Sequence, residues 1–321
     1  MKRWTYAFLL CSQLLPAVSL ACNTTLSPGS NVISNAVNAS PNGAVICLNN
    51  GIYAQTVQVA LKSNQRLTGL GTRNNAKITF QGVNRAVTMK LGSKLNHVTL
   101  EGLDPNGTAE YGVLAFNAGN NQVWDVGIEN FQIGVGLNGS PNGRITSVHI
   151  SDTGNPFNTL PDPAIWIRNS DNTRVRFGRI DGASNGPGGD GEISCFSSRF
   201  LEIDGLNVID SGASAIYLVG CADAVVENTV VHRAGEWGID VVDGSSNFTA
   251  RNNEVWWSNF AGSVYDETDN GPGTYENNDF RNNNLGGVAN CTGVAVNGTQ
   301  SNVTMIGNVV TPGPQTCSPP T

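Results

Sequence analysis

The sequence predicts an all-β protein built as a parallel β-helix solenoid, on three observations. First, a short β-type run followed by a polar turn recurs between about residue 95 and residue 310, in steps of 30, 28, 22, 25 and 25 residues. Second, the runs alternate apolar and polar side chains, as in 215–219 and 238–242. Third, clusters of Gly, Asn, Ser and Asp separate the runs. The equivalent apolar positions of six copies are Ile150, Ile180, Val208, Val230, Val255 and Phe280. Repeats of this length indicate stacked coils.

Other repeat architectures fit the pattern less well. No 11-residue window sustains apolar residues at i, i+3 and i+4, which disfavours helical repeats. Leucine-rich repeats need leucines at fixed offsets, whereas these coils use Val, Ile and Phe. Asn suits the turns because it tolerates left-handed backbone conformations. We therefore expect two or three short strands per coil.

The chain divides into four expected segments. They are a secretory signal peptide at 1–21, an N-terminal cap at 22–44, the parallel β-helix at 45–311 and a Pro-rich tail at 312–321. The signal peptide is predicted from a basic start, a short apolar stretch and a small-residue cleavage site. Cys22, directly after that site, leaves a lipoprotein as the alternative. One short amphipathic helix is expected at 32–40 within the cap.

The order of the first elements resembles a known superfamily. The helix at 32–40 is followed by the segments 43–48, 51–53 and 67–71. This order is similar to the cap and first coils of pectin-lyase-like right-handed parallel β-helix proteins, and the later coils are similar to their degenerate repeats. The resemblance covers roughly residues 30–310 and implies one elongated right-handed solenoid. It implies no particular activity, because one fold hosts many functions.

The cysteines are expected to form three disulfides. Without Cys11, which belongs to the signal peptide, six remain: Cys22 and Cys47, Cys195 and Cys221, Cys291 and Cys317. The members of each pair are 25 or 26 residues apart, close to one coil. Neighbouring coils lie about 4.8 Å apart, within disulfide reach, so sequential pairing is favoured over the other connectivities. A metal site is the alternative, but no CxxC or Cys/His cluster supports it.

The net charge and the predicted secretion restrict the molecules that the protein is expected to bind. The formal net charge is −7, and it is −9 without the signal peptide's Lys2 and Arg3. Such an acidic chain is a poor ligand for nucleic acids and anionic membranes. No later apolar segment approaches the length of about 18 residues that spans a bilayer. We expect a secreted monomer, extracellular or periplasmic, whose partner is a polysaccharide.

One outward stripe is the candidate site. Ile165, Ile193, Ile216, Ile239 and Val264 align as an inward column, so the residues one step on point outward. These outward residues are Trp166, Ser194, Tyr217, Asp240 and Tyr265, and two steps further come Arg168, Phe196, Val219, Val242 and Glu267. Aromatic rings suit the apolar faces of sugars, and Asp and Arg suit their hydroxyls or carboxylates. The alternative is that the rings fill a loop-covered surface.

The predicted catalytic residues are His232, Arg233, Asp240, Tyr217 and Tyr265. His is well matched to proton transfer near neutral pH, and His232 has Arg233, Glu236 and Trp237 close by in the sequence. Its alternative is a structural role. His97 and His149 occupy similar strand ends without such neighbours. Trp166, Arg168 and Glu267 are the predicted substrate-binding residues.

Calcium is the one cofactor that the sequence suggests. Asp181, Asp190 and Glu192 surround a Gly-rich loop at 186–191, which is similar to a single calcium nonapeptide turn. Such sites need tandem copies, so a simple loop is the alternative. The run 266–270 is a second oxygen-rich cluster, for which a solvated turn is the favoured alternative.

Three functions follow from these residues. The first is a polysaccharide lyase or C5-epimerase acting on a uronate-containing glycan. Its base would be Tyr, His or Arg, because no Lys follows Lys94. The second is a glycoside hydrolase that uses Asp240 and Asp266, one coil apart. The third is a non-catalytic β-helix that binds glycan or serves as an adhesin.

Overall fold

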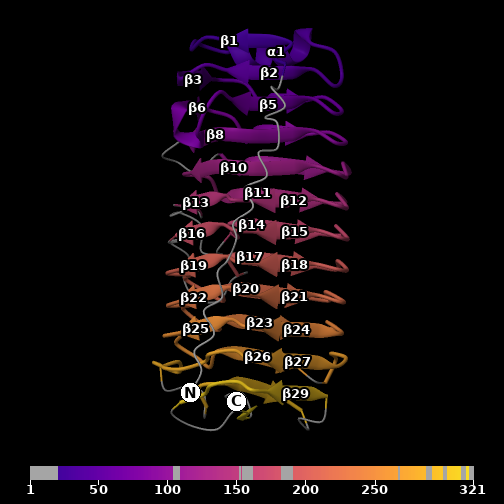
Figure 1. Ribbon diagram of the computed structural model, residues 1–321, viewed down its shortest axis with the longest axis vertical. Coiled ribbons are helices and arrows are strands. Elements are labelled where there is room, and N and C mark those ends of the chain that lie inside the picture. The colour runs from indigo at the N-terminus through magenta and orange to yellow at the C-terminus, as the bar shows by residue number, and fades with distance from the viewer. Residues whose placement is uncertain are drawn as a thin grey trace, which may run out of the picture.

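The computed structural model describes residues 21–103, 109–151, 153, 162–181, 191–266, 268–286, 291–298, 302–311 and 316–317. These residues form a stack of coils with the cap at one end (Figure 1). The predicted signal peptide, apart from residue 21, lies outside the described residues. Each regular coil has three short strands, and the strands of successive coils pair in parallel to build three walls.

The first and second walls form one 19-stranded sheet, because β8 and β10 run through both. The first wall contains β1 (Thr24–Leu26), β2 (Val45–Leu48), β5 (Arg66–Gly69), β8 (Lys94–Gly102), β10 (Gln122–Glu129), β12 (Arg144–Thr146), β15 (Arg174–Arg176), β18 (Glu202–Asp204), β21 (Val225–Glu227), β24 (Phe248–Arg251), β27 (Gly273–Glu276) and β29 (Val303–Ile306). The second wall contains β3 (Gly51–Gln55), β6 (Ala76–Phe80), the ends of β8 and β10, β13 (His149–Ser151), β16 (Arg179–Asp181), β19 (Asn207–Ile209), β22 (Val230–His232) and β25 (Glu254–Trp256).

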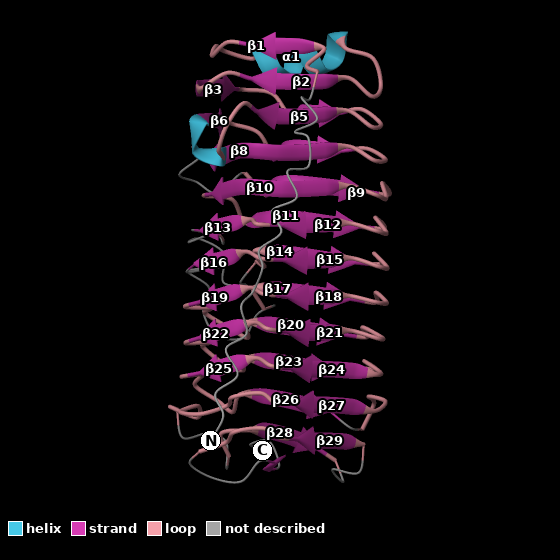
Figure 2. Cartoon of the chain, in the orientation of Figure 1, coloured by secondary structure: helices cyan, strands magenta, loops and turns pink. Residues whose placement is uncertain are grey.

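The third wall is a separate 11-stranded sheet. It contains β4 (Val59–Leu61), β7 (Arg85–Met89), β9 (Tyr111–Phe116), β11 (Ile133–Asn138), β14 (Ile165–Arg168), β17 (Ile193–Phe196), β20 (Ile216–Val219), β23 (Ile239–Val242), β26 (Ser263–Asp266), β28 (Val294–Asn297) and β30 (Thr316–Cys317). Helix is confined to α1 (Val32–Ala39) and the 3₁₀ turn η1 (Arg73–Asn75) within the described residues (Figure 2). None of the described helices is long and apolar enough to cross a membrane.

The corner between the first and second walls has two residues in the later coils, and the first position has a left-handed backbone. Asn228, Asn252 and Asn277 occupy it in successive coils, with φ between 51° and 55°. Asn tolerates this conformation better than most residues, which explains why the turns are rich in it. The corner from the second to the third wall is longer, and the third corner returns the chain to the first wall of the next coil.

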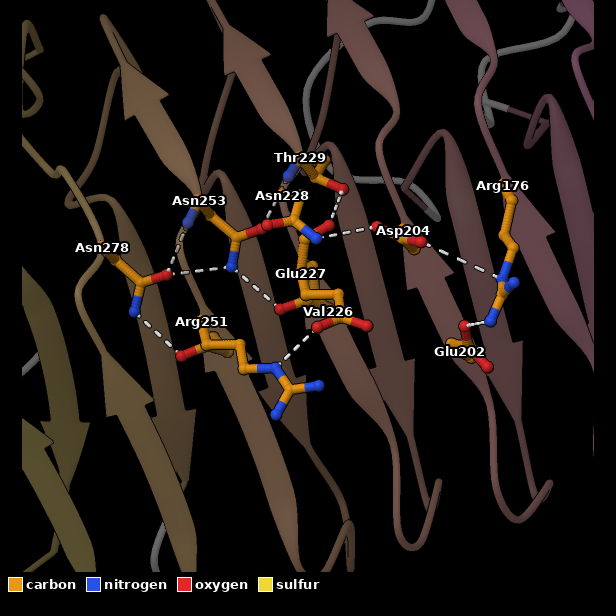
Figure 3. Close-up of polar contacts among 11 residues, drawn as sticks. Arg176, Glu202, Asp204, Val226, Glu227, Asn228, Thr229, Arg251, Asn253 and Asn278 are labelled. Carbon is orange, nitrogen blue, oxygen red and sulfur yellow. Dashed lines mark hydrogen bonds and ion pairs between the residues drawn. The ribbon is translucent and has the colours of Figure 1, made fainter. Parts of the chain in front are cut away.

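Polar ladders run inside two of the corners. At the third corner, the Ser170 N–H donates to Ser198 Oγ at 2.9 Å. At the first corner, Asn253 N and Nδ2 donate to Asn278 Oδ1 at 3.0 and 2.9 Å (Figure 3). Asn278 Nδ2 donates in turn to Asn308 Oδ1 at 3.0 Å. These side chains satisfy buried backbone groups that the strands leave unpaired at the corners.

The main expectations for the fold are confirmed. The chain is an all-β parallel solenoid with one short capping helix, whose Ile33 and Val37 are fully buried against the first coils. The inward residues form one continuous apolar core along the stack. The three sequential disulfides are present: Cys22–Cys47, Cys195–Cys221 and Cys291–Cys317.

Two details differ from the sequence expectation. Val231, and not Val230, is the inward equivalent of Val208 and Val255, because β22 pairs one residue further along. Both valines are apolar, so the pattern alone did not separate them. Strand β30 lies within the segment 312–321 that was expected to be a tail, and it extends the third wall by pairing with β28.

Candidate active site on the third wall

The outer face of the third wall carries most of the predicted stripe. Trp166 pairs with Ser194, Ser194 with Tyr217, and Tyr217 with Asp240, so these residues form one file across four coils. Alternation along the strands turns their neighbours inward, where Ile193, for example, is fully buried. Ser194 is also buried, and its hydroxyl donates to the Gly191 carbonyl at 2.8 Å. The file runs along the solenoid axis with a spacing of about 4.8 Å per coil.

Tyr265 does not belong to this file. Ile239 pairs with Ser263 and Asp240 pairs with Val264, one residue earlier than the sequence pattern indicated. Tyr265 therefore points inward and is fully buried. Ser263 occupies the inward position because its hydroxyl donates to the Ile239 carbonyl at 2.6 Å. The inference that Tyr265 faces outward is wrong, and its buried ring cannot meet a glycan.

Two apolar clusters lie along the third wall, apart from the core. One contains Tyr111, Leu114 and Ile133, with Trp166 packed against it, and the other contains Trp237, Ala261, Val264, Cys291, Ala295 and Cys317. Trp166 is therefore half-buried and not an open platform. Ser194, Tyr217 and Asp240 lie between the two clusters in the file, and we call these three residues the polar gap.

Asp240 has the most perturbed chemistry of the polar gap. Its residue surface is partly open, but its Oδ1 is buried and has no hydrogen-bond partner among the described residues. Desolvation raises the pKa of Asp240 to about 7, and the charges of Glu236 and Asp243 add to the rise. The Ser214 hydroxyl opposes it by donating to Oδ2 at 3.3 Å. Such a carboxyl holds a proton near neutral pH, which suits a general acid.

Tyr217 and Arg168 occupy the same face. The Tyr217 ring meets Phe196 edge-to-face, with centroids 6.0 Å apart. Arg168 pairs with Phe196 in the next outward file and is exposed. Glu267 lies outside the described residues. Asp266 follows Tyr265 at the end of β26 and accepts a hydrogen bond from Asn297 at 3.2 Å.

His232 and Arg233 lie elsewhere. His232 ends a strand of the second wall, where its ring stacks on Trp256 at a centroid distance of 5.3 Å and meets the edge of Trp257 at 5.2 Å. Burial, and then the charge of Arg233, lowers the pKa of His232. Arg233 begins the second corner and pairs with Asp210, Nη2 to Oδ2, at 2.8 Å. This corner separates both residues from the third wall, so the structure does not group them with the polar gap.

The predicted calcium ligands have different surroundings. Asp181, on the second wall, accepts from Arg179 Nε at 2.6 Å and lies 3.2 Å from His149 Nε2. Glu192 is only 1% exposed, and burial raises its pKa to about 8, with a serine hydroxyl opposing. Asp190 lies outside the described residues, so calcium binding by the three stays a prediction.

Within the described ranges, one carboxylate trio converges closely enough to suggest a metal. It consists of Glu202, Asp204 and Glu227 on the first wall. Arginines already occupy it: Arg251 Nε lies 2.6 Å from Glu227, and Arg176 pairs with Glu202 and lies 4.0 Å from Asp204 (Figure 3). The trio is therefore a charge-compensated ladder of the sheet.

Sequence reasoning missed the partners of two histidines. His97 Nδ1 lies 2.8 Å from Asp125 Oδ2, and His149 pairs with Asp181. Neither contact is visible in the sequence around the histidines, because both carboxylates come from the next coil. Only the register between coils would have revealed them.

The three-walled stack of parallel strands is that of a right-handed parallel β-helix protein with the pectin-lyase-like fold. The family described as "Right handed beta helix region" matches residues 96–285, and the chain belongs to this family. A search of curated protein sequences finds no match.

Solved structures share the fold at low sequence identity. An endo-xylogalacturonan hydrolase from Aspergillus tubingensis has a TM-score of 0.65 at 11% identity, covering 89% of this chain and 92% of that one. The A-module of the mannuronan C-5 epimerase AlgE4 from Azotobacter vinelandii has a TM-score of 0.56 at 12% identity, covering 92% and 100%. The ORF18 protein of Geobacillus virus E2 has a TM-score of 0.58 at 13% identity and 86% coverage, and this chain spans 56% of its length.

Proposed function

We propose that the protein is a secreted enzyme that cleaves a uronate-containing glycan on the outer face of the third wall. One observation carries the proposal. Asp240 has a pKa of about 7 and lies beside Tyr217 on a face where apolar clusters lie on both sides. Strongly perturbed carboxyls on an outer face are candidates for acid catalysis.

Hydrolysis is the reaction that this chemistry supports best. A protonated Asp240 would donate its proton to the glycosidic oxygen as the bond to the leaving sugar breaks. A second carboxylate must then activate water or attack the sugar directly. Glu236 and Asp243 are the candidates, since both act on Asp240 electrostatically. Tyr217 and Phe196 would bind the sugar ring, and Arg168 would neutralise a uronate carboxylate.

A lyase or C5-epimerase is the second candidate, favoured by Tyr217 and Arg168 on the same face. Both reactions remove the proton at C5 after the neighbouring carboxylate has been neutralised. In this mechanism Arg168 would neutralise the carboxylate and Tyr217 would be the base. His232 and Arg233, preferred from the sequence alone, are less suitable because they lie across the second corner.

Secretion belongs to the same proposal. Three disulfides form and persist in oxidising compartments, which is consistent with an extracellular protein. The features of residues 1–21 supply the export signal. We propose a monomer as the working form.

The test is a product analysis on pectic and alginate polymers. Hydrolysis releases reducing ends without ultraviolet-absorbing unsaturated sugars, elimination produces both, and epimerisation changes the polymer composition with no new ends. Asp240→Asn should lower hydrolysis about 10²- to 10⁴-fold, since it removes a general acid. Asp243→Ala serves to test the second carboxylate. Polymer binding with no turnover by the wild-type protein would overturn the enzyme proposal and favour a glycan-binding module.

A further inference from the structure

The first wall carries a file of cations in an otherwise acidic protein. Arg66 pairs in register with Lys94, Lys94 with Gln122, Gln122 with Arg144, and Arg144 with Arg174. The file beside it contains Thr68, Asn96, Trp124, Thr146 and Arg176, of which Thr68 and Asn96 are buried and Trp124, Thr146 and Arg176 reach the surface. Neither file contains a carboxylate over these five coils. We call the ten residues the basic strip.

The basic strip ends sharply at the next coil. From Glu202 onward the same two files contain carboxylates, and Figure 3 shows Arg176 at the boundary and Arg251 beyond it, both engaged by acids. Lys94 and Arg144 have no ion pair with any described residue. Arg66 Nε donates to the amide oxygen of Asn96 at 3.1 Å, which orients the guanidinium without neutralising it.

Trp124 provides a fixed aromatic surface at the centre of the basic strip. The residue is 46% exposed, and its indole meets the His97 ring edge-to-face, with centroids 4.6 Å apart. Asp125 holds His97 in turn, with 2.8 Å between Oδ2 and Nδ1. A shallow depression of about 150 Å³ lies beside the indole and is lined also by Arg144 and Thr146. An exposed indole that neighbouring side chains fix in place, next to the unpaired Lys94 and Arg144, suits a ligand with a flat apolar face and negative charge.

We propose that the basic strip binds one strand of an acidic polysaccharide along the solenoid axis. Its carboxylate or sulfate groups would meet the cations, and one sugar ring would lie on Trp124. The strip is two residues wide, which matches a single chain, and the exposed indole suits the apolar face of a sugar ring. The inference does not depend on the proposed function, because the strip lies on a different wall from Asp240.

The first experiment compares charge-neutralised variants. The variant Lys94→Gln/Arg144→Gln removes two unpaired cations, and Arg199→Gln/Arg281→Gln removes two exposed cations that are already paired with Asp223 and Asp279. Affinity for polygalacturonate and alginate oligomers is measured by calorimetry over a range of salt concentrations. The first variant should bind at least tenfold more weakly and with a smaller salt dependence, since fewer counterions are released. The control variant should bind as the wild type does.

The second experiment tests the aromatic surface and the choice of polymer. Trp124→Ala should weaken oligomer binding at least threefold without changing the melting temperature, because the indole is exposed. Asp240→Asn should leave binding at the strip unchanged, so loss of hydrolysis and loss of strip binding are separable. Unchanged affinity in Lys94→Gln/Arg144→Gln would overturn the proposal. So would tighter binding of the wild type to single-stranded DNA or to phosphatidylserine vesicles than to the oligomers.

Discussion

Replacing Asp240 by Asn should stabilise the protein at alkaline pH while abolishing its proposed catalysis. In the folded state the pKa of Asp240 is raised from 3.8 to about 7, chiefly by desolvation. Below pH 3.8 the carboxyl is protonated in both the folded and the unfolded chain, so ionisation of Asp240 costs the folded state no stability. As the pH rises to about 7, the unfolded chain releases the proton and the folded chain keeps it, so stability is lost.

The size of the effect follows from that difference in pKa. A shift from 3.8 to about 7 corresponds to roughly 4 kcal/mol, and because part of the residue is open to solvent, screening reduces the expected value to about 2 kcal/mol. An Asn side chain avoids the loss because it does not ionise. Asp240→Asn should therefore raise the free energy of unfolding by about 2 kcal/mol at pH 8, or the melting temperature by about 4 to 8 °C.

The assay is a pair of thermal melts, at pH 4 and pH 8, for the wild type and Asp240→Asn. The gain should be small at pH 4 and reach its full value at pH 8. Asp243→Asn is the comparison: it removes the same charge from an exposed residue just after the same strand, and should show a much smaller pH-dependent gain, because Asp243 contributes least to the raised pKa of Asp240. Equal gains at both pH values, or a destabilised Asp240→Asn at pH 8, would refute the assignment of a desolvated acid.

Three further outcomes test the rest of the structure. Asn278→Ala should lower the free energy of unfolding by about 1 to 3 kcal/mol in urea melts, because it leaves buried groups of Asn253 without a partner. A loss no larger than that of an exposed Asn→Ala would show that the asparagine ladder does not stabilise the fold. Cys195→Ser/Cys221→Ser should lower stability by about 2 to 4 kcal/mol without shifting the products of the reaction, and an unchanged melting curve would show that the bridge is dispensable. His232→Ala should retain glycan turnover within a few fold, and its loss would return that residue to the active site.

The sequence was sufficient for the fold because each coil repeats the same local requirements. Alternation sets the inward residues, Asn and Gly mark the corners, and a one-coil spacing fixes the disulfides. The capping helix was also predictable, since its apolar side needs only the first coils as a partner. The stripe of Trp166, Tyr217 and Asp240 followed from the same alternation.

The arrangement of the site depended on information that no local pattern contains. Ser263 is polar yet points inward, because hydrogen bonds replace apolar packing, and this reversed the assignment of Tyr265. His232 and Asp240 are eight positions apart in sequence, but a corner places them on different walls. The basic strip could not be predicted from the sequence, because its members come from coils of unequal length. They align only once the pairing of every coil is known.

The three disulfides give the solenoid an unusual mechanical profile. Each joins residues of two neighbouring coils, with separations of 25, 26 and 26 residues, at the two ends and near the middle. A stack in which each coil contacts only its neighbours would yield under axial tension by peeling one coil at a time from an end. The terminal bridges block that first step, and the middle bridge divides the remaining length into two segments that extend separately. Reduction should therefore convert a protein that resists pulling into one that unwinds progressively from its ends.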